Sequence, residues 1–424
     1  MKVWHVNTTS RGGGVAEVLD ALCRFPQGTS PLVHRRFVTG RDAKLFTATK
    51  RLHHRLHGVH RGELPDAYEH ALFLAFAEHN ATRLLERIGS DDSVLLHDPQ
   101  TLPIAPLLAA EGCRVFWRCH IGTWTANAVT KETWRYLSQF WPRDITLIFS
   151  HRSLVPVEAT GFHVEIVPPS IDPISVKNRH MGAGEIKDVL TSAGLLGRAS
   201  AGPGRQHVLY SEGVLGKDPL VLQVSRWDPL KDMGGVLRAF ASSSLVRSAQ
   251  LVLCGPSPQS VTDDPEARAV LEAVVTQWQN LPSAVRRRAH LVCTTLDDDE
   301  GNARLVNALQ RRAAVVTQRS VQEGFGLTVT EAMLKARPVV ASNVGGIPTQ
   351  ITHDKTGLLL NRPCDDDEFV AAVTRLLRDE ARASALGRAA ASHTSRHFIT
   401  AREAADHQRI LASPVPPPMV GCLD

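Results

Sequence analysis

Short apolar runs alternate with longer segments of mixed polarity along the whole chain. The first run, residues 2–7, is followed by a glycine-rich stretch and then by a helical pattern over residues 15–25. A longer helical pattern covers residues 67–88. Because strands that alternate with helices form parallel sheets, the first part of the chain is predicted to be a doubly wound α/β domain. Its further strands are predicted in four apolar runs, at residues 94–97, 115–118, 146–149 and 164–167.

A second series of the same kind begins near residue 220. A proline-rich stretch, residues 167–173, and a polar segment reaching residue 218 separate it from the first series. The strands of the second series are predicted at residues 220–224, 250–253, 290–293, 313–316 and 338–341, and its last helices at residues 366–379 and 401–411. The predicted parts are an N-terminal domain (1–172), a linker (173–218), a C-terminal domain (219–395), and a last helix and tail (396–424) returning to the N-terminal domain.

The predicted fold class is therefore α/β, with two Rossmann-like, doubly wound domains that face each other across a cleft. Ligands of such sheets bind outside the carboxyl ends of the strands. The proline-rich tail, residues 414–418, cannot be helical and is expected to be loosely held.

The composition excludes several classes of protein. With 424 residues, 43% of them hydrophobic, the chain can bury two cores. A net charge of +5 does not argue for a nucleic-acid or membrane partner. Seven scattered cysteines without a CxxC pair indicate neither a disulfide framework nor a zinc ribbon. No signal peptide opens the chain and no apolar run approaches the length of about 18 residues that spans a membrane, so we expect a soluble, cytoplasmic protein.

The histidine-rich stretch over residues 51–57 is interpreted as an exposed basic helix or loop. It lacks the acidic or cysteine partners that a metal site needs, although the chain has 19 histidines. We therefore predict no metal site.

Two glutamates, Glu323 and Glu331, flank a glycine-rich turn that leads into a helix predicted over residues 330–336 and stopped by Pro338. Such a turn presents backbone N–H groups beside the positive end of a helix, which suits an anion. The carboxylates would repel phosphate and therefore suit hydroxyl groups on either side of it. A nucleotide sugar has this arrangement. Glu331 is expected in the first helical turn, where the helix dipole alone could also favour one carboxylate, but not two.

Two cations are expected at the carboxyl end of the strand over residues 220–224. Arg226 and Lys231 follow this strand, and together they suit a pyrophosphate, although solvated surface cations would have the same pattern. In the first domain, Gly12, Gly13 and Gly14 follow the first strand and let the backbone approach a ligand closely. This loop matches neither the dinucleotide GxGxxG pattern nor a P-loop, and a plain flexible turn remains an alternative.

These motifs together resemble the retaining glycosyltransferases of family four, which have the GT-B fold. Within that family the likeness is greatest to the trehalose glycosyltransferring synthases. Stretches in the same order carry this likeness, and they cover most of the chain: residues 3–17, 97–100, 117–121, 168–173, 226–229 and 323–331.

The resemblance implies a role for each donor-side residue. Arg226 and Lys231 would hold the diphosphate and stabilise the leaving charge, and Glu331 would bind the ribose. Glu323 would grip the sugar hydroxyls with four backbone N–H groups, those of Gly324, Phe325, Gly326 and Leu327.

On the first domain, His120 would touch the transferred sugar and Gly12 to Gly14 would close over the phosphates. A histidine that ends an apolar strand can also be purely structural. The resemblance implies that the configuration at the anomeric carbon is retained by front-face attack, and that Glu323 is not a covalent nucleophile. It also implies that the reaction needs no metal or cofactor, with the nucleotide sugar as a co-substrate.

The acceptor side departs from the resemblance. The trehalose group normally has an aspartate after the Cys-His-Ile triplet, whereas this chain has Gly122. With Asp98, this position is assigned to the acceptor side. A missing carboxylate removes a partner for a glucose hydroxyl, and such a loss changes discrimination strongly. Glucose as acceptor, to give trehalose, is therefore one hypothesis; a natural-product glycosyltransferase with another sugar and a non-glucose, even non-sugar, acceptor is its rival.

Two other classes stay open at this point. A phosphorylase would use glucose 1-phosphate and inorganic phosphate, and a sugar-binding module would catalyse nothing. The second fits poorly, because binding a sugar does not require the diphosphate cations. The expected partners are small molecules, not nucleic acid or membrane, and a homodimer is compatible with the sequence.

Overall fold

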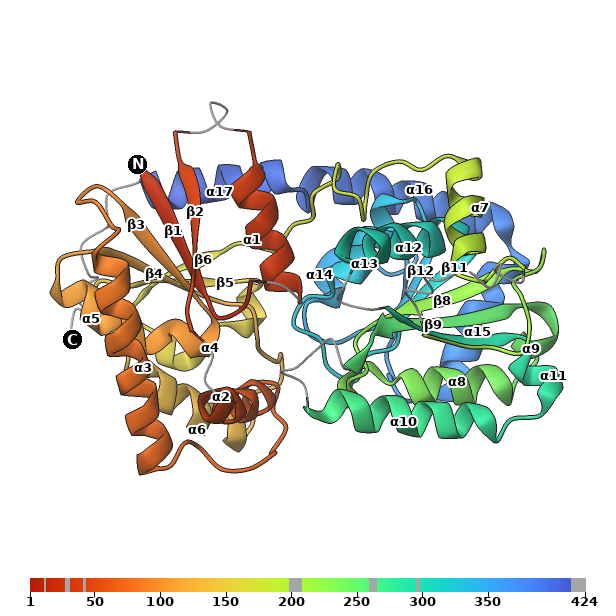
Figure 1. Ribbon diagram of the computed structural model, residues 1–424, viewed down its shortest axis with the longest axis horizontal. Coiled ribbons are helices and arrows are strands. Elements are labelled where there is room, and N and C mark those ends of the chain that lie inside the picture. Colours follow the sequence, from red (N-terminus) through yellow and green to blue (C-terminus); the bar gives the residue numbers. More distant parts are fainter. Residues whose placement is uncertain are drawn as a thin grey trace. The chain divides into compact units, whose positions relative to one another are not determined.

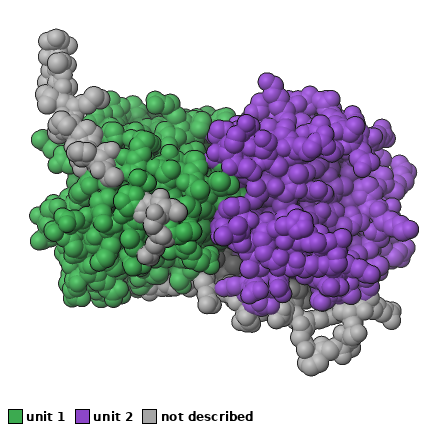
Figure 2. Space-filling model, turned by 90° about the horizontal axis from the view of Figure 1, so that it is seen from above, with its two compact units in different colours: residues 1–171, 398–424 green, residues 172–397 purple. Residues whose placement is uncertain are grey.

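The computed structural model describes residues 1–10, 13–26, 31–40, 43–197, 208–258, 265–294 and 298–412. Two compact units are distinguished (Figure 2). Unit 1 comprises Met1–Ile171 and Phe398–Asp424, and unit 2 comprises Asp172–His397. The predicted tail over residues 414–418 lies outside the described residues, as does Gly12.

Unit 1 is built on a six-stranded sheet with the order β2-β1-β3-β4-β5-β6, in which every described pairing is parallel. Each apolar run predicted in this part of the chain forms a strand. The strands are β1 (Lys2–Asn7), β2 (Val33–Val38), β3 (Ser93–His97), β4 (Arg114–Cys119), β5 (Thr146–Phe149) and β6 (His163–Ile166).

Helices cover both faces of this sheet. The last of them, α17, lies beside α1 although nearly the whole chain separates the two (Figure 1). The α-helices are α1 (Gly14–Arg24), α2 (Ala43–Leu56), α3 (Ala67–Leu85), α4 (Asp98–Thr101), α5 (Ala105–Ala110), α6 (Ala128–Ser138) and α17 (Thr400–Ala412). The short 3-10 helices in the described part of unit 1 are η1 (Leu102–Ile104), η2 (Arg152–Leu154) and η3 (Val157–Ala159).

Unit 2 is built on a seven-stranded sheet with the order β13-β12-β11-β8-β9-β10-β7. The edge strand β7 runs antiparallel to β10, and the other described pairings are parallel. The strands are β7 (Val208–Tyr210), β8 (Leu220–Val224), β9 (Gln250–Pro256), β10 (Ala289–Thr294), β11 (Val315–Gln318), β12 (Val339–Ser342) and β13 (Leu358–Leu360).

The helices of unit 2 include one in the stretch 173–218 that was expected to be a linker. This helix, α7, packs against α12, and β7 of the same stretch joins the sheet. The helices are α7 (Ala183–Ser192), η4 (Pro229–Lys231), α8 (Met233–Ala241), α9 (Leu245–Ser248), α10 (Pro265–Gln279), α11 (Ser283–Arg286), α12 (Asp299–Arg312), α13 (Leu327–Leu334), α14 (Ile347–Gln350), α15 (Asp366–Arg378) and α16 (Glu380–His397). Among the described residues, no helix combines the length and apolar character that a membrane span requires.

Each sheet carries an apolar core on both faces, which explains the continuous apolar runs in the sequence. In β8, Val221 belongs to the core on one face, while Leu220 and Leu222 belong to the core on the other. Parallel strands that are covered on both sides in this way leave their carboxyl ends as the place for polar chemistry.

The histidine-rich stretch over residues 51–57 was wrongly predicted to be exposed. Its residues 51–56 form the end of α2, which packs against α6. The side chain of Arg55 is fully buried, and it binds Glu132, the hydroxyl of Thr133 at 3.2 Å and the carbonyl of Gly62 at 2.8 Å. Charged side chains can be buried when their donors are satisfied in this way, and composition alone does not reveal such partners.

The strand order reverses at one point in each sheet. In unit 1 the reversal lies between β1 and β3, and in unit 2 it lies between β8 and β11. Ligands of open α/β sheets bind at such switch points. The predicted site residues follow these strands: Arg226 and Lys231 come after β8, Glu323 after β11, and Asp98 directly after β3.

Candidate active site

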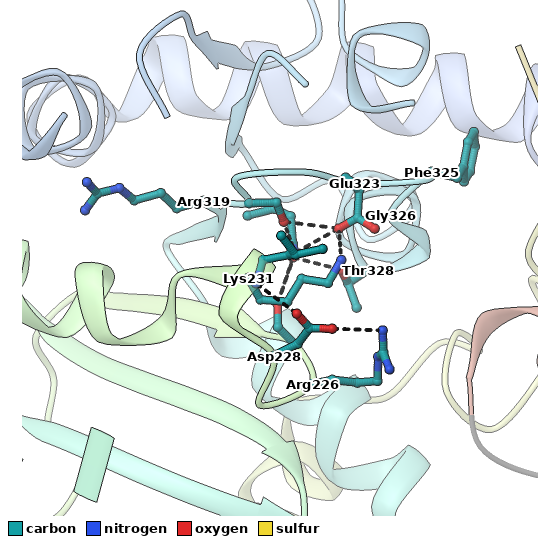
Figure 3. Close-up of polar contacts among 12 residues, drawn as sticks. Arg226, Asp228, Lys231, Arg319, Glu323, Phe325, Gly326 and Thr328 are labelled. Atoms are coloured by element: carbon teal, nitrogen blue, oxygen red, sulfur yellow. Dashed lines mark hydrogen bonds and ion pairs between the residues drawn. The ribbon is translucent and has the colours of Figure 1, made fainter. Parts of the chain in front are cut away.

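In unit 2, the chain leaves β8 through a turn that the Asp228 carboxylate organises. This carboxylate accepts a hydrogen bond from the Leu230 amide at 2.8 Å and an ion pair from Arg226 at 3.2 Å. The turn brings Lys231 toward the segment that follows β11. There the Lys231 Nζ lies 2.6 Å from Oε2 of Glu323 (Figure 3).

The Glu323 carboxylate is held in place by several donors. Besides Lys231, its Oε2 accepts hydrogen bonds from the Ser320 hydroxyl at 3.1 Å and the Gln318 amide at 3.3 Å. Gln318 is itself fixed, because the Thr328 hydroxyl donates to its Oε1 at 3.0 Å. The glutamate side chain is 10% exposed. These contacts all end on Oε2, so Oε1 is the oxygen suited to a ligand hydroxyl.

The glycine-rich turn after Glu323 starts helix α13 earlier than the sequence suggested. Gly326 has a φ of 88°, a conformation that glycine adopts without strain, and the helix begins at Leu327. The prediction that Glu331 lies in the first helical turn is therefore wrong. The first-turn N–H groups, which lack intrahelical partners, belong to the residues just after Gly326 instead.

Glu331 is buried beneath other side chains. Its carboxylate has no exposed surface, and it lies 2.9 Å from the Lys177 Nζ and 3.3 Å from the Gln310 amide. A ribose hydroxyl could reach this fully buried carboxylate only if neighbouring side chains moved, and Lys177 is the partly exposed member of the ion pair.

A second glycine turn packs against the first. Gly345 and Gly346 follow β12, and the Gly346 amide donates to the Glu323 carbonyl at 3.2 Å. A Cβ at residue 345 would lie 1.5 Å from that same carbonyl oxygen, and a Cβ at residue 346 would lie 2.4 Å from the Gly324 carbonyl oxygen. The backbone approach that positions Glu323 thus requires both glycines.

In unit 1, Asp98 and His120 lie together at the carboxyl ends of β3 and β4. The His120 amide donates to Asp98 Oδ1 at 2.9 Å, and the Trp117 indole donates to the Asp98 carbonyl at 3.0 Å. Asp98 has a φ of 62°, which is unusual for a residue other than glycine and marks local strain. Desolvation raises the pKa of Asp98 to about 7, and burial lowers the pKa of His120 well below its usual range.

Gly122 lies against an apolar side chain. A Cβ at this position would come within 3.1 Å of Leu154 Cδ2 and 3.2 Å of Leu154 Cβ, and the Gly122 carbonyl accepts a hydrogen bond from His57 Nδ1 at 3.0 Å. An aspartate at residue 122 would therefore require Leu154 to shift. The packing at this position thus involves Leu154 as well as Gly122.

The glycine loop of unit 1 is only partly described. Gly13 has a φ of 94° and caps α1, which begins at Gly14, with no other atom near a Cβ built on Gly13. Gly12 lies outside the described residues. The left-handed conformation at Gly13 explains why glycine stands there.

Comparisons with known proteins show the family of this chain. A family model described as "Trehalose synthase, N-terminal domain" matches residues 5–156, and one described as "Glycosyl transferases group 1" matches residues 210–393. A trehalose synthase from Rubrobacter xylanophilus is 34% identical over 97% of this chain and 90% of its own length. The chain belongs to the trehalose synthase family. It is therefore a glycosyltransferase, as predicted from the sequence.

Solved structures of much lower sequence identity share the fold. A UDP-forming trehalose-phosphate synthase from Burkholderia xenovorans, solved in complex with glucose-6-phosphate, matches with a TM-score of 0.72 at 15% identity, covering 97% of this chain and all of that one. The predicted GT-B class, with two Rossmann-like domains, is confirmed. A trehalose phosphorylase from Pleurotus pulmonarius is 26% identical over 96% of this chain but 56% of its own length.

Sequence reasoning missed several side chains that hold the site together. Gln318 and Lys177 contact the two predicted glutamates, and His97 contacts His120. Gln318 ends β11, so its place at the carboxyl end of a strand could have indicated it. Nothing in the local pattern indicated Lys177, which lies 154 positions before Glu331.

Proposed function

We propose that the protein transfers a glucosyl group from a nucleoside-diphosphate glucose to glucose, with retention of configuration, and so forms trehalose. The observation that carries this proposal is the pairing of Lys231 with Glu323, beside Arg226, at the switch point of the unit 2 sheet. The name of the 34% identical relative supports trehalose as the product.

The donor half of the reaction needs positive charge where the diphosphate departs. Arg226 offers a planar fork for phosphate oxygens and Lys231 offers a compact charge. The N–H groups at the start of α13 add aligned dipoles. Preorganised groups of this kind stabilise a developing negative charge. We therefore propose that neither a metal ion nor another cofactor takes part.

The acceptor oxygen would attack the anomeric carbon on the face from which the diphosphate leaves. The bond from that carbon to the phosphate oxygen breaks, the bond to the acceptor oxygen forms, and the departing oxygen takes the acceptor proton. Glu323 would hold sugar hydroxyls through Oε1 while Lys231 and Ser320 engage Oε2. A carboxylate held by these donors is a weak nucleophile, which supports retention without a covalent intermediate.

Replacing either site cation tests the donor assignment. Arg226→Ala and Lys231→Ala should each lower kcat roughly 10²–10³-fold, the loss typical of removing one preorganised donor. Trehalose formed from UDP-, ADP- or GDP-glucose and glucose would be measured by mass spectrometry, and its α,α linkage by NMR.

Arg288→Ala is the matched control for these variants. Arg288 is also a partly exposed arginine paired with an aspartate, Asp218 at 2.8 Å, but it precedes β10 at the amino end of the same sheet. It should retain normal turnover. Near-normal turnover in both Arg226→Ala and Lys231→Ala would contradict the donor site.

A second candidate concerns the acceptor alone. Leu154 fills the space beside Gly122, so the carboxylate expected in the trehalose group is replaced by apolar surface. This favours a less hydroxylated acceptor than glucose. Kinetics with a panel of sugars and small alcohols, each offered with the nucleotide sugar that the protein uses, would identify the acceptor. Transfer to glucose at the highest kcat/KM supports trehalose formation. A clear preference for another acceptor contradicts it.

A phosphorylase would differ in the ligand that it binds. If nucleoside diphosphates are products, they should raise the melting temperature by mass action, by an amount equivalent to about 2.7 kcal/mol at a concentration 100 times Kd. Inorganic phosphate alone should not. Stabilisation by phosphate and not by any nucleoside diphosphate would identify a phosphorylase.

A further inference from the structure

Four histidines of unit 1 form an unbroken chain of ring-to-ring hydrogen bonds that ends at His120. His34 Nδ1 lies 2.8 Å from His5 Nε2, His5 Nδ1 lies 3.1 Å from His97 Nε2, and His97 Nδ1 lies 3.0 Å from His120 Nε2. Each link joins the Nδ1 of one ring to the Nε2 of the next. The chain therefore runs in one sense across β2, β1, β3 and the end of β4.

The environment keeps these rings neutral. His34, His5 and His97 are buried, and only His120 is partly exposed. Burial lowers the pKa of each ring, that of His34 to about 4. The other charged and titratable groups that face the chain are Arg36 on β2, Asp98 after β3, Arg118 on β4, and Glu403 and His407 on α17.

Neutrality couples the four rings. A neutral imidazole has one N–H donor and one lone pair, so each ring that donates to one neighbour must accept from the other. The direction of a single link therefore fixes the direction of all the others. One ring nitrogen remains at each end, namely His34 Nε2 and His120 Nδ1. One of these two atoms must then carry a hydrogen and the other a lone pair.

The buried end favours one direction. His34 Nε2 has no hydrogen-bond partner among the described residues. Buried N–H groups without a partner are rarer than buried acceptors without one, so His34 Nε2 carries the lone pair. His34 then donates to His5, His5 donates to His97 and His97 donates to His120. The remaining nitrogen, His120 Nδ1, carries a hydrogen at the partly exposed end.

We propose that His34, His5 and His97 are positioning residues that fix His120 as its Nδ1–H tautomer, so that His120 donates a hydrogen bond to a hydroxyl of the bound sugar. This rests on the proposed function in one respect, namely that His120 contacts the sugar. A ring held by three successive hydrogen bonds presents a donor of defined direction before the sugar arrives, which is the kind of preorganisation that catalysis uses.

A metal site is a different interpretation of the same residues. One nitrogen from each of His5, His34 and His407 lies within 4.8 Å of the others. Both nitrogens of His5 are already engaged by other rings, however, and the Arg118 guanidinium lies 3.4 Å from His407 Nε2. A fixed cation at that distance disfavours a divalent ion, so the geometry supports the hydrogen-bonded chain.

Nitrogen NMR on protein labelled with [15N]histidine tests the tautomer directly. The His120 signals would be assigned by their loss in His120→Asn. In the wild type, Nδ1 should show a one-bond coupling to hydrogen and Nε2 should not. The reverse pattern, or two patterns from a mixture of tautomers, would overturn the proposal. One equivalent of zinc in the purified protein would also overturn it if the zinc were lost in a His407→Leu variant.

Variants at His5 test whether the hydrogen-bonded histidines determine the tautomer of His120. His5→Leu breaks the chain without touching His120, and His120 should then show both tautomers. His5→Asn should restore a single tautomer, because its amide can donate toward His97. If His5→Leu does not fold, His34→Leu removes the outer link instead. His290→Leu is the control, since His290 is also buried but lies in unit 2, bonded to Ser211 at 2.6 Å.

Kinetics add a second readout. His5→Leu should lower kcat about 10-fold, as loss of a supporting partner typically does, with little change in KM for the donor, and His5→Asn should recover most of it. An unchanged His120 tautomer in both His5→Leu and His34→Leu would overturn the proposal. The NMR result does not depend on turnover. A protein that transfers no sugar yet shows the single His120 tautomer would therefore contradict the proposed function but still support the role of the hydrogen-bonded histidines.

Discussion

At the scale of single residues, Asp98 combines backbone strain with a buried carboxylate. Its φ of 62° lies in the left-handed region, and its Oδ1 accepts the His120 amide at 2.9 Å. Aspartate and asparagine tolerate this conformation better than most residues, because their short side chains hydrogen-bond locally. The residue thus fixes the position of His120 through the His120 backbone amide.

Asp98→Asn should change how stability depends on pH. The folded pKa of about 7 lies above the ordinary value of 3.8, so between these values the folded state binds more protons than the unfolded state. The free energy of unfolding of the wild type should therefore fall as pH rises through this range. Asparagine keeps the acceptor and the left-handed backbone but does not titrate.

The melting temperatures of both proteins from pH 4 to pH 8 at constant ionic strength check this prediction. The Tm of Asp98→Asn minus that of the wild type should increase up to about pH 7 and then level off. Titration of the histidines is common to both proteins and cancels in the difference. Parallel curves would show that Asp98 has an ordinary pKa.

At the scale of elements, the part of the unit 2 site around Glu323 is made by two strand-to-helix turns that pack against each other. The β11–α13 turn carries Glu323, and the β12–α14 turn supplies Gly345 and Gly346 behind it. The two strands are adjacent and parallel, so their turns emerge at the same edge of the sheet. The position of the glutamate thus depends on the backbone of a neighbouring turn.

Gly345→Ala should therefore displace Glu323 as well as strain the backbone. Its φ is +52° and its Cβ would lie 1.5 Å from the Glu323 carbonyl oxygen. The left-handed conformation alone costs roughly 1–2 kcal/mol, and the forced shift typically costs a further 1–3 kcal/mol. We expect a lower Tm together with a large loss of kcat.

Gly161→Ala separates these two effects. Gly161 has a φ of +89° but no atom within 4 Å of its Cβ position. This variant should show the cost of backbone strain alone and near-normal turnover. If Gly345→Ala and Gly161→Ala lowered Tm and kcat equally, the close packing behind Glu323 would not matter for the site.

At the scale of the molecule, unit 1 is assembled from both ends of the chain. Helix α17 brings Glu403 to Arg118 of β4, and both side chains are fully buried in an ion pair. Arg118 also donates to the Val167 carbonyl at 3.0 Å. Ile410 and Leu411 of α17 join the apolar core on the same face of the sheet as Val3. Helix α17 is thus part of the core of unit 1.

Glu403→Leu should destabilise the protein strongly, because it leaves a buried guanidinium without its counter-charge. Breaking a buried pair in this way costs roughly 3–5 kcal/mol, which corresponds to a fall in Tm on the order of 10 °C for a unit of this size. Differential scanning calorimetry would measure it.

The double variant Arg118→Met/Glu403→Leu distinguishes charge from packing. It removes both charges and should be more stable than Glu403→Leu alone. A double variant that is less stable than the single one would show that packing by Arg118, and not its unpaired charge, accounts for the loss.

The sequence by itself determined most of the strands of this protein and the polar residues that follow them, but not β2, β7 or β13. Continuous apolar runs mark strands that are covered on both faces, and glycine turns mark the places where the backbone needs a left-handed conformation, as at Gly13 and Gly326. Arg226, Lys231 and Glu323 could be singled out because their types and their places after strands are local properties.

Only the tertiary structure decided which of these side chains meet. Crossover connections bring Lys231 to Glu323 across 92 positions and Lys177 to Glu331 across a longer separation. The same sheet order aligns the rings from His34 to His120, and α17 returns to close over them. The physical reason is that periodicity specifies which face of an element is buried, whereas contacts between elements depend on sheet order and register, which no local pattern records.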